Sequence, residues 1–106
     1  MAKRGEKVDA GVCAERLRAI ADADRLRIVC VLQEGAKSVT EIAISLGVAV
    51  VNASHHLQVL RRAEVLATER RGRKIFYRLA DGVFPRTPGE LDLGCCRLQI
   101  EPQKID

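Results

Sequence analysis

Two pairs of adjacent residues carry most of the chemistry that this sequence offers. His55-His56 contains both histidines of the chain, and Cys95-Cys96 contains two of its four cysteines. Imidazole and thiolate groups bind metal ions and act as bases or nucleophiles, and thiols are also oxidised. The positions of these residues along the predicted helices and strands decide which of these reactions are open to the protein.

The histidine pair lies in residues 51–62, VNASHHLQVLRR. Ala53, Leu57 and Leu60 recur at i, i+4 and i+7, which predicts an amphipathic helix. Adjacent residues of a helix diverge by about 100°, whereas a histidine pair that binds zinc is spaced i, i+4. No carboxylate or cysteine lies one turn away in the sequence, and a base would have no catalytic partner. We therefore predict neither a joint metal site nor an enzyme.

The four cysteines fall into two groups. Cys13 and Cys30 lie in predicted helices, so packing as small hydrophobic side chains is the default expectation for both. Cys95 and Cys96 follow a proline-containing linker in LDLGCCRLQI, where alternating apolar residues fit a strand. Consecutive strand residues point to opposite faces, so these two thiols could ligate one ion only if the chain turned at Gly94.

The composition predicts one small domain with an aliphatic core. The chain has 106 residues, of which 47% are hydrophobic, 30% charged and only 3% aromatic. No apolar run reaches a membrane-spanning length, and no apolar segment follows the basic residues of MAKRGEKVDAG. We therefore expect a cytoplasmic protein with no membrane partner. Its cysteines are expected to be reduced rather than to form a disulfide framework.

The net charge of +4 is concentrated in one region of the chain. Residues 61–78 contain seven basic and two acidic side chains, so the remainder of the chain is slightly acidic. A scattered excess would favour an ordinary solvated surface. This concentration instead indicates a surface that meets a polyanion.

The hydrophobic pattern predicts four helices followed by a β-hairpin. The helix boundaries are marked by Asp9 as the first cap, by Asp22 or Asp24 and Gly35 for the second helix, and by Thr40 and Gly47 for the third. In the first helix, Cys13, Leu17 and Ile20 share the apolar face. The second helix is apolar almost all round and should be central.

Two β-rich runs follow the histidine helix and flank Arg71-Gly72, a predicted hairpin turn. Ile75, Tyr77 and Leu79 alternate along the second run as in a half-buried strand. Residues 81–89, DGVFPRTPG, have the composition of a linker.

A short helix, a turn, an amphipathic helix and a basic hairpin follow one another as in a winged helix-turn-helix. RLRIVCVLQEG, SVTEIAISLGV, SHHLQVLRRAEVL and RRGRKIFYRLADG resemble successive blocks of the ArsR/SmtB family of bacterial transcriptional repressors. The resemblance covers roughly residues 21–82. It implies a homodimer that binds double-stranded operator DNA and is released by a metal ion, metalloid or other small inducer.

The expected architecture is mostly α with a β-hairpin wing and an atypical extended C-terminal segment. Residues 1–82 would form the winged helix-turn-helix DNA-binding domain. Residues 83–106 would form a linker and a segment associated with the dimer, with the first helix making most of the interface.

The resemblance assigns DNA contacts to the histidine helix and the wing. Groups expected to reach base edges or phosphates are Asn52, His55 and Gln58; groups expected to contact the backbone or flank the groove are Thr40, Ser54, His56, Arg61 and Arg62; wing groups expected at the neighbouring minor groove are Arg70, Arg71, Arg73 and Lys74. For His56, a half-buried hydrogen bond to neighbouring backbone is an equal alternative.

The start of the histidine helix departs from the family pattern. Family members commonly carry small polar residues there, whereas this chain has Ala49-Val50-Val51-Asn52. A capping oxygen and two potential base contacts are missing, although apolar side chains contact thymine methyl groups. DNA affinity should therefore depend on phosphate charge and fall steeply with salt.

Two sensing sites known in the family are absent from this sequence. KSVTEIAISL has no cysteine where a C-x-C-type metal site begins, and no histidine follows His56 for a C-terminal zinc or cobalt site. Two other sensing sites of the family resemble cysteine sets that this chain contains. Sulfide-responsive members pair a second-helix cysteine, here Cys30, with one near the C-terminus, here Cys95 or Cys96. Arsenite-binding members use three thiolates, here Cys95 and Cys96 with Cys13 or Cys30.

The resemblance thus implies release by a thiol-directed signal, either reactive sulfur or a thiophilic metalloid such as arsenite; no other cofactor is expected. Two alternatives stay open. The cysteines could only pack, in a DNA-binding module without an inducer. The domain could also have lost DNA recognition and bind proteins, for which Ala49-Val50-Val51 is the sole support.

Overall fold

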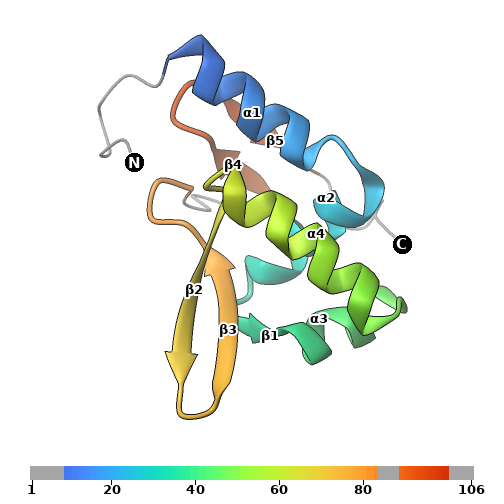
Figure 1. Cartoon of the computed structure of the whole chain (residues 1–106). Helices are drawn as coiled ribbons and strands as arrows, with labels where there is room; N and C mark the ends of the chain where they lie inside the picture. The colour runs from blue at the N-terminus through green and yellow to red at the C-terminus, as the bar shows by residue number, and fades with distance from the viewer. Residues whose placement is uncertain (1–8, 84–88, 101–106) are drawn as a thin grey trace.

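Four helices carry a β-hairpin wing and a separate C-terminal hairpin (Figure 1). The computed structural model describes residues 9–83 and 89–100. Along the chain the elements are α1 (Ala10–Ile20), α2 (Ala23–Leu32), β1 (Lys37–Ser38), α3 (Val39–Leu46), α4 (Val50–Arg62), β2 (Leu66–Arg71), β3 (Lys74–Leu79), β4 (Glu90–Asp92) and β5 (Arg97–Gln99). The predicted winged helix-turn-helix, with its extended C-terminal segment, is confirmed.

Side-chain caps begin the first three helices. Asp9 and Asp22 cap α1 and α2, as predicted. The predicted cap of α3 is wrong: Ser38, not Thr40, accepts the hydrogen bond of the Glu41 amide at 3.3 Å. The Glu41 carboxylate in turn accepts from the Ser38 amide at 2.8 Å, which completes a capping box. Thr40 is therefore an exposed residue of the first helical turn.

The core is aliphatic and centred on α2, as expected. Ile28 and Val29 of α2 are fully buried, and Leu57 and Leu60 of α4 pack into the same cluster. The predicted face of α1 is partly wrong, because Leu17 is 38% exposed while Arg16 is buried. Helical periodicity marks the apolar side of a helix, but it does not anticipate that Arg16 is buried against a distant part of the chain, where it donates to the Leu93 carbonyl.

The wing is an antiparallel pair, β2 with β3, whose register runs from Leu66 opposite Leu79 to Arg71 opposite Lys74. The hairpin turn therefore falls on Gly72 and Arg73, one residue later than predicted. Gly72 adopts a φ of 63°, a conformation that favours glycine. The two-residue β1 pairs with β3 on its other side, which ties the wing to the start of α3.

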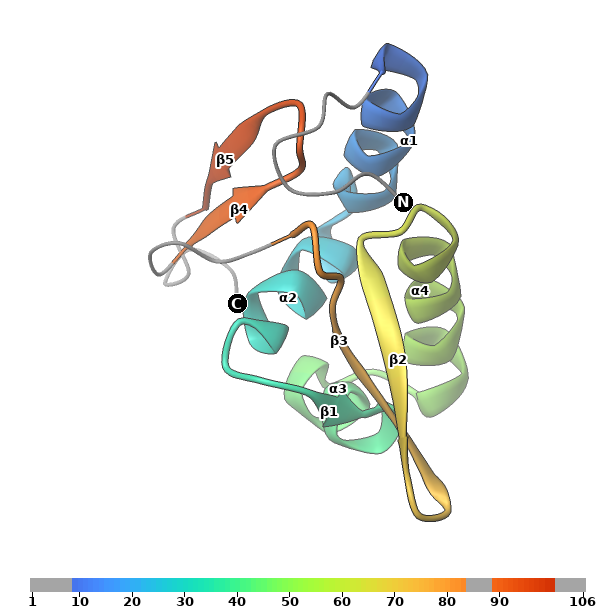
Figure 2. The ribbon, with the colours of Figure 1, turned by 90° about the vertical axis from the view of Figure 1, so that its left-hand side faces the viewer.

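The C-terminal segment is a hairpin rather than a single strand. β4 pairs with β5, and the chain turns at Gly94, whose φ is 90°. Leu91 and Leu93 are fully buried in the same core as the helices. The hairpin lies beside α1 and α2 of its own chain (Figure 2). Of the predicted linker, residues 84–88 lie outside the described ranges.

One glutamine holds the start of this hairpin against α2. The Gln33 side-chain amide donates to the Glu90 carbonyl at 3.4 Å and accepts from the Gly89 amide at 3.1 Å. The nitrogen and the oxygen of this side-chain amide thus both bond to the backbone at the start of β4. The tail is anchored by a polar contact at its start and by buried leucines beyond it.

Replacing Leu91 by alanine should lower the free energy of unfolding by about 2–5 kcal/mol, because it leaves a cavity in the shared core. Urea unfolding followed by circular dichroism, with the cysteines in one redox state, measures the change. Ile44→Ala is the matched control, since Ile44 is 75% exposed and its change should stay within about 0.5 kcal/mol. Equal effects of the two substitutions would mean that the tail does not share the core.

Candidate nucleic-acid interface and thiol cluster

The histidine helix, α4, has one face in the core and one toward solvent. Ala53, Leu57 and Leu60 are fully buried, as the helical spacing predicts. An outward stripe, defined by Val51, His55, Gln58 and Arg62 at i, i+4, i+7 and i+11, runs along the opposite side. Gln58 is half-buried and the other three are exposed. Asn52 is exposed beside the stripe and Ser54 is half-buried.

The first turn of α4 is apolar and lacks a side-chain cap. Ala49 occupies the cap position without a side-chain hydrogen bond. Val50 is 48% and Val51 74% exposed. The last turn is basic, with Arg61 and Arg62 both exposed. The helix therefore presents apolar groups at its positive end and cations at its negative end.

The wing places a group of cations at its tip. Arg70, Arg71, Arg73 and Lys74 are all exposed there. Arg71 is the most constrained, because its Nε lies 2.9 Å from the Glu69 carboxylate and its guanidinium stacks 4.4 Å above the Phe76 ring. Such a tip can meet phosphates at low sequence specificity.

His56 is turned toward α2 instead of toward solvent. Its Nδ1 lies 3.2 Å from the Arg25 guanidinium and 3.9 Å from Asp22, and its Nε2 lies 3.6 Å from Asp24. The expected backbone partner is thus wrong, because the observed neighbours are side chains. The His55 ring lies 5.9 Å away at 57°, which agrees with the prediction that the two histidines do not act together.

Asp22, Asp24 and Arg25 are the residues of this cluster that sequence reasoning missed. They lie about thirty residues before His56, so no local spacing signals the contact. One atom from each of Asp22, Asp24 and His56 falls within 4.8 Å of the others, a grouping that could hold a metal ion. Arg25 already supplies a positive charge to it, and we call Asp22, Asp24, Arg25 and His56 the clamp, because the contacts of His56 with the other three join α4 to α2.

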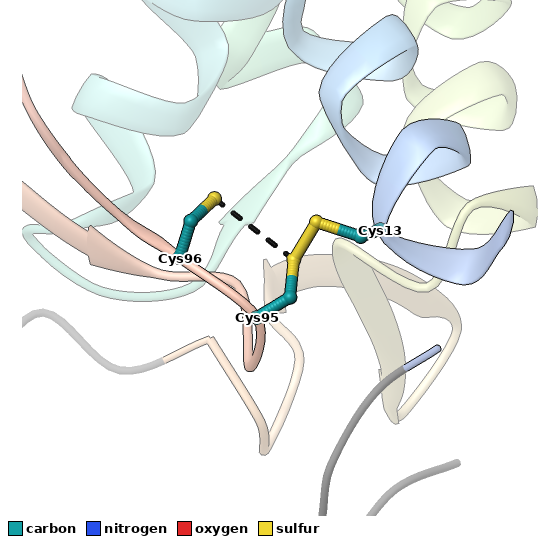
Figure 3. Close-up of side chains that lie close together, drawn as sticks. All are labelled: Cys13, Cys95 and Cys96. Carbon is teal, nitrogen blue, oxygen red and sulfur yellow. Dashed lines mark hydrogen bonds between the residues drawn. A yellow bond between two sulfur atoms is a disulfide. The ribbon is translucent and has the colours of Figure 1, made fainter. Parts of the chain in front are cut away.

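Three of the four cysteines come together at the tip of the C-terminal hairpin (Figure 3). Cys13 of α1 and Cys95 form a disulfide with a Cα–Cα distance of 6.1 Å, so the expectation of reduced cysteines is wrong for this pair. The Sγ of Cys96 lies 3.9 Å from that of Cys95. The three sulfurs lie within 4.8 Å of one another.

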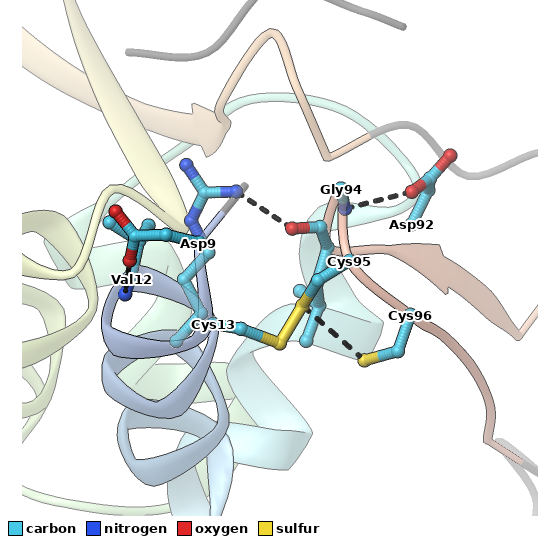
Figure 4. The surroundings of a disulfide bond; sticks show 9 residues. Asp9, Val12, Cys13, Asp92, Gly94, Cys95 and Cys96 are labelled. Atoms are coloured by element: carbon cyan, nitrogen blue, oxygen red, sulfur yellow. Dashed lines mark hydrogen bonds between the residues drawn. A yellow bond between two sulfur atoms is a disulfide. The ribbon is translucent and has the colours of Figure 1, made fainter. Parts of the chain in front are cut away.

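The turn at Gly94 explains why Cys95 and Cys96 do not point to opposite faces. The Asp92 carboxylate accepts a hydrogen bond from the Gly94 amide at 2.9 Å (Figure 4). The Leu93 amide donates to the Cys96 carbonyl at 2.9 Å and closes the turn. The condition stated for joint ligation, a turn at Gly94, is therefore met.

Cys30 stands apart from this group. It is a free, half-buried thiol of α2, and burial raises its pKa. A raised pKa lowers the fraction of thiolate at neutral pH and makes the sulfur less reactive. Of the predicted sensing residues, the structure groups Cys13, Cys95 and Cys96, and Cys30 lies outside this group.

Arg16 connects the thiol cluster with the end of α4. It lies one turn after Cys13 and is the sole buried charged side chain among the described residues. Its Nη1 donates to the Leu93 carbonyl at 2.7 Å, and its Nη2 lies 3.7 Å from the Glu64 carboxylate. Glu64 follows α4 in a left-handed conformation with a φ of 63°. One guanidinium thus contacts both the cysteine turn and the residue at which the chain leaves the histidine helix.

Comparison with known proteins identifies the class. A family model described as "Bacterial regulatory protein, arsR family" matches residues 22–68. The HTH-type transcriptional repressor SmtB of Mycobacterium tuberculosis is 43% identical over 67 residues, 63% of this chain and 50% of that protein. The biofilm growth-associated repressor of Xylella fastidiosa is 36% identical over 81 residues, 76% of this chain and 67% of that protein.

Solved structures agree. HlyU from Vibrio cholerae superimposes with a TM-score of 0.64 at 30% identity, covering 68% of this chain and 78% of that one. The cadmium sensor CmtR from Mycobacterium tuberculosis gives 0.58 at 37% identity, covering 64% and 71%. A homodimeric winged helix-turn-helix DNA-binding domain from Mycobacterium bovis gives 0.64 at 31%, covering 66% and 65%.

The fold and these relatives define a winged helix-turn-helix domain of the kind found in transcriptional regulators. The chain belongs to the ArsR/SmtB family. This is a family of regulators and not of enzymes, in agreement with the sequence-based expectation. The chain aligns with half of the length of SmtB.

No single described helix is long and apolar enough to cross a membrane. The consecutive helices α3 and α4 together would meet the length and composition criteria, but they are bent by 110° at the break between them.

The lowered pKa of Asp22 predicts a pH dependence of stability. The hydrogen bond from the Arg25 amide, with the charges of Arg25 and His56, lowers the pKa of Asp22. A carboxylate with a lowered folded-state pKa stabilises the protein above its unfolded pKa, and this stability is lost as the pH falls through the lowered value. Asp22→Asn keeps the cap but removes the charge.

Urea unfolding between about pH 6 and about pH 2 should therefore show a larger loss for wild type than for Asp22→Asn, with the two curves converging at the acid end. Asp9→Asn makes the same exchange at the cap of α1 and reports the effect of the exchange alone. Parallel curves for wild type and Asp22→Asn would rule out a charge-dependent clamp.

Proposed function

We propose that the protein is a homodimeric transcriptional repressor whose affinity for operator DNA is set by the state of the Cys13–Cys95–Cys96 cluster. The observation that carries this proposal is the meeting of three sulfurs from α1 and the tail, within one helical turn of a buried arginine that reaches the end of α4. A regulator of bacterial DNA works in the cytoplasm. There most thiols are kept reduced, and a disulfide is usually a transient sensing state.

DNA binding combines two surfaces of different character. The wing tip and the C-terminal turn of α4 supply cations for the phosphate backbone. The outward stripe enters the major groove, where His55 and Gln58 reach base edges. His56 holds α4 on α2 and therefore positions the helix, rather than contacting phosphate itself.

Two chemistries act on the same sulfurs. A polysulfide transfers a sulfur atom to one thiolate; the second thiolate attacks the resulting persulfide, so that the Cys13–Cys95 bond forms and hydrosulfide leaves. Arsenous acid instead reacts with three thiols: each thiol proton leaves with one hydroxyl group as water, and three arsenic–sulfur bonds replace the three arsenic–oxygen bonds. Soft thiolates suit such a metalloid. The two signals exclude each other, because oxidation consumes two of the three ligands.

Arg16 carries the signal toward DNA. The Leu93 carbonyl that accepts its hydrogen bond lies two residues before Cys95, so a change at the sulfurs alters the position of this acceptor. The guanidinium is buried and its Nε has no hydrogen-bond partner among the described residues. A shift of Arg16 therefore changes its pairing with Glu64 and with it the end of α4.

A second candidate function is a DNA-binding module without an inducer. The observation that favours it is the tail itself: Leu91 and Leu93 are fully buried, so a Cys13–Cys95 bond could serve only to staple a packed segment. Cross-linking two residues 82 apart in sequence stabilises a fold by roughly 4–5 kcal/mol in the chain-entropy description.

Fluorescence anisotropy of a duplex from upstream of the protein's own gene separates the two. Reduced protein should bind tightly, and arsenite or a polysulfide should each weaken binding by about 5- to 150-fold, the usual range of coupling between sites. Cys96→Ser should lose the arsenite response and keep the polysulfide response, because it retains Cys13 and Cys95. Cys13→Ser should lose both.

Cys30→Ser is the control and should respond like wild type. Equal affinity of the wild-type protein in all four conditions — reduced, oxidised, with arsenite, with polysulfide — would favour the module without an inducer. A response that disappears only in Cys30→Ser would move the sensor to α2.

Charge reversal tests the wing. Arg71→Glu with Arg73→Glu should weaken DNA binding and reduce the slope of log affinity against log salt, because the slope falls by about 0.9 for each phosphate that the protein no longer neutralises. Arg97→Glu, an exposed change of the same kind on β5, is the control. Titrations at several salt concentrations with reduced protein provide the slopes. A double variant indistinguishable from Arg97→Glu would contradict a role of the wing in DNA binding.

A further inference from the structure

We propose that Val51 is a specificity residue that reads the C5-methyl group of thymine in the major groove. The inference rests on the proposed DNA-binding function and adds to it the kind of base that the helix prefers. Val51 is 74% exposed at the start of α4 and belongs to the same outward stripe as His55 and Gln58. Any docking that brings those two side chains to base edges carries Val51 into the same groove, one turn nearer the N-terminus.

The position of Val51 favours DNA over a second copy of the chain as the partner that this apolar side chain contacts. The N-terminal end of α4 and the tip of the wing lie toward the same end of the molecule in both views (Figures 1 and 2). Exposed cations therefore occur on the wing tip, toward the same end as the start of α4, and at Arg62, which lies at the other end of the stripe from Val51. This charge complements a polyanion and opposes the approach of a second, equally basic copy.

The chemistry of the side chain selects the base. An isopropyl group has no hydrogen-bond donor or acceptor, so it cannot read the polar edges of guanine, cytosine or adenine. The one apolar group that bases display in the major groove is the thymine methyl. The cap is Ala49 and the next residue is Val50, so the polar side chain nearest to Val51 in the first turn is Asn52, which lies beside the stripe and not on it. We therefore expect an A·T pair opposite Val51 in each half-site.

Replacing thymine by deoxyuridine tests this contact, because it removes the methyl group and leaves the base pair and its O4 acceptor unchanged. Single substitutions through the duplex defined above should identify one thymine per half-site whose replacement weakens binding of reduced wild-type protein by about fourfold, the effect of one buried methyl group. Val51→Ser should bind the thymine and uracil duplexes equally. Val51→Thr, which retains one methyl group, should show an intermediate ratio.

Val50→Ser is the matched control, since it makes the same change one residue away and off the stripe; it should keep the wild-type thymine-to-uracil ratio. A wild-type protein that binds but ignores every uracil would overturn the inference and leave the DNA-binding function standing. So would a ratio unchanged in Val51→Ser, or abolished only in Val50→Ser. Absence of binding to any duplex would overturn both. A Val51→Ser variant that changes only the oligomeric state would reassign the side chain to an interface between copies.

Discussion

A buried guanidinium constrains the arrangement of three parts of this protein. Arg16 is only 2% exposed, and an isolated charge in that position would be strongly unfavourable. Its partners are the Leu93 carbonyl of the tail and the Glu64 carboxylate after α4. The face of α1, the turn of the C-terminal hairpin and the end of the histidine helix must therefore be placed together. Among the described residues its Nε has no hydrogen-bond partner.

This constraint explains how the extended C-terminal segment is held against α1. Leu91 and Leu93 bury one side of β4, while the turn at Gly94 brings both cysteines of the pair toward α1. Cys13 and Arg16 lie one turn apart on that helix, so the same surface meets the sulfurs and the Leu93 carbonyl. The sensing chemistry proposed for the sulfurs and the packing of the tail consequently depend on the same surface of α1.

Periodicity and turn residues predict the parts of the fold that depend on local rules. Asp9 and Asp22 begin helices because an aspartate side chain satisfies free amides there, and Ala53, Leu57 and Leu60 are buried because they share a helical face. The turn of the wing is predictable to within one residue. These features need only neighbours within a few positions in the chain.

The errors of the sequence-based prediction concern contacts between distant residues. Sequence spacing gives His56 no partners because Asp22, Asp24 and Arg25 lie on another helix, and periodicity assigns Leu17 to the core because it does not anticipate a buried arginine.

The cysteines show the same limit, that sequence patterns do not predict which distant residues come into contact. The strand pattern places Cys95 and Cys96 on opposite faces and names a turn at Gly94 as the exception, and the turn is what the fold contains. The sequence does not decide whether Cys13 or Cys30 lies beside Cys95 and Cys96, since both lie in predicted helices. That choice follows from which face α1 turns toward the tail.

The proposed recognition of DNA by α4 divides two roles, holding the helix and reading the bases, between its side chains. His56 lies toward α2 and within reach of two carboxylates and a guanidinium, so its ring is committed to fixing the helix. Its neighbour His55 lies about 100° further round and belongs to the exposed stripe. The proposal therefore gives the two adjacent histidines different roles: His56 holds α4 on α2, and His55 faces the DNA. In the proposed mechanism, the contacts of His56 hold α4 on α2, and a signal that reaches the end of α4 through Arg16 shifts the outward stripe against the groove.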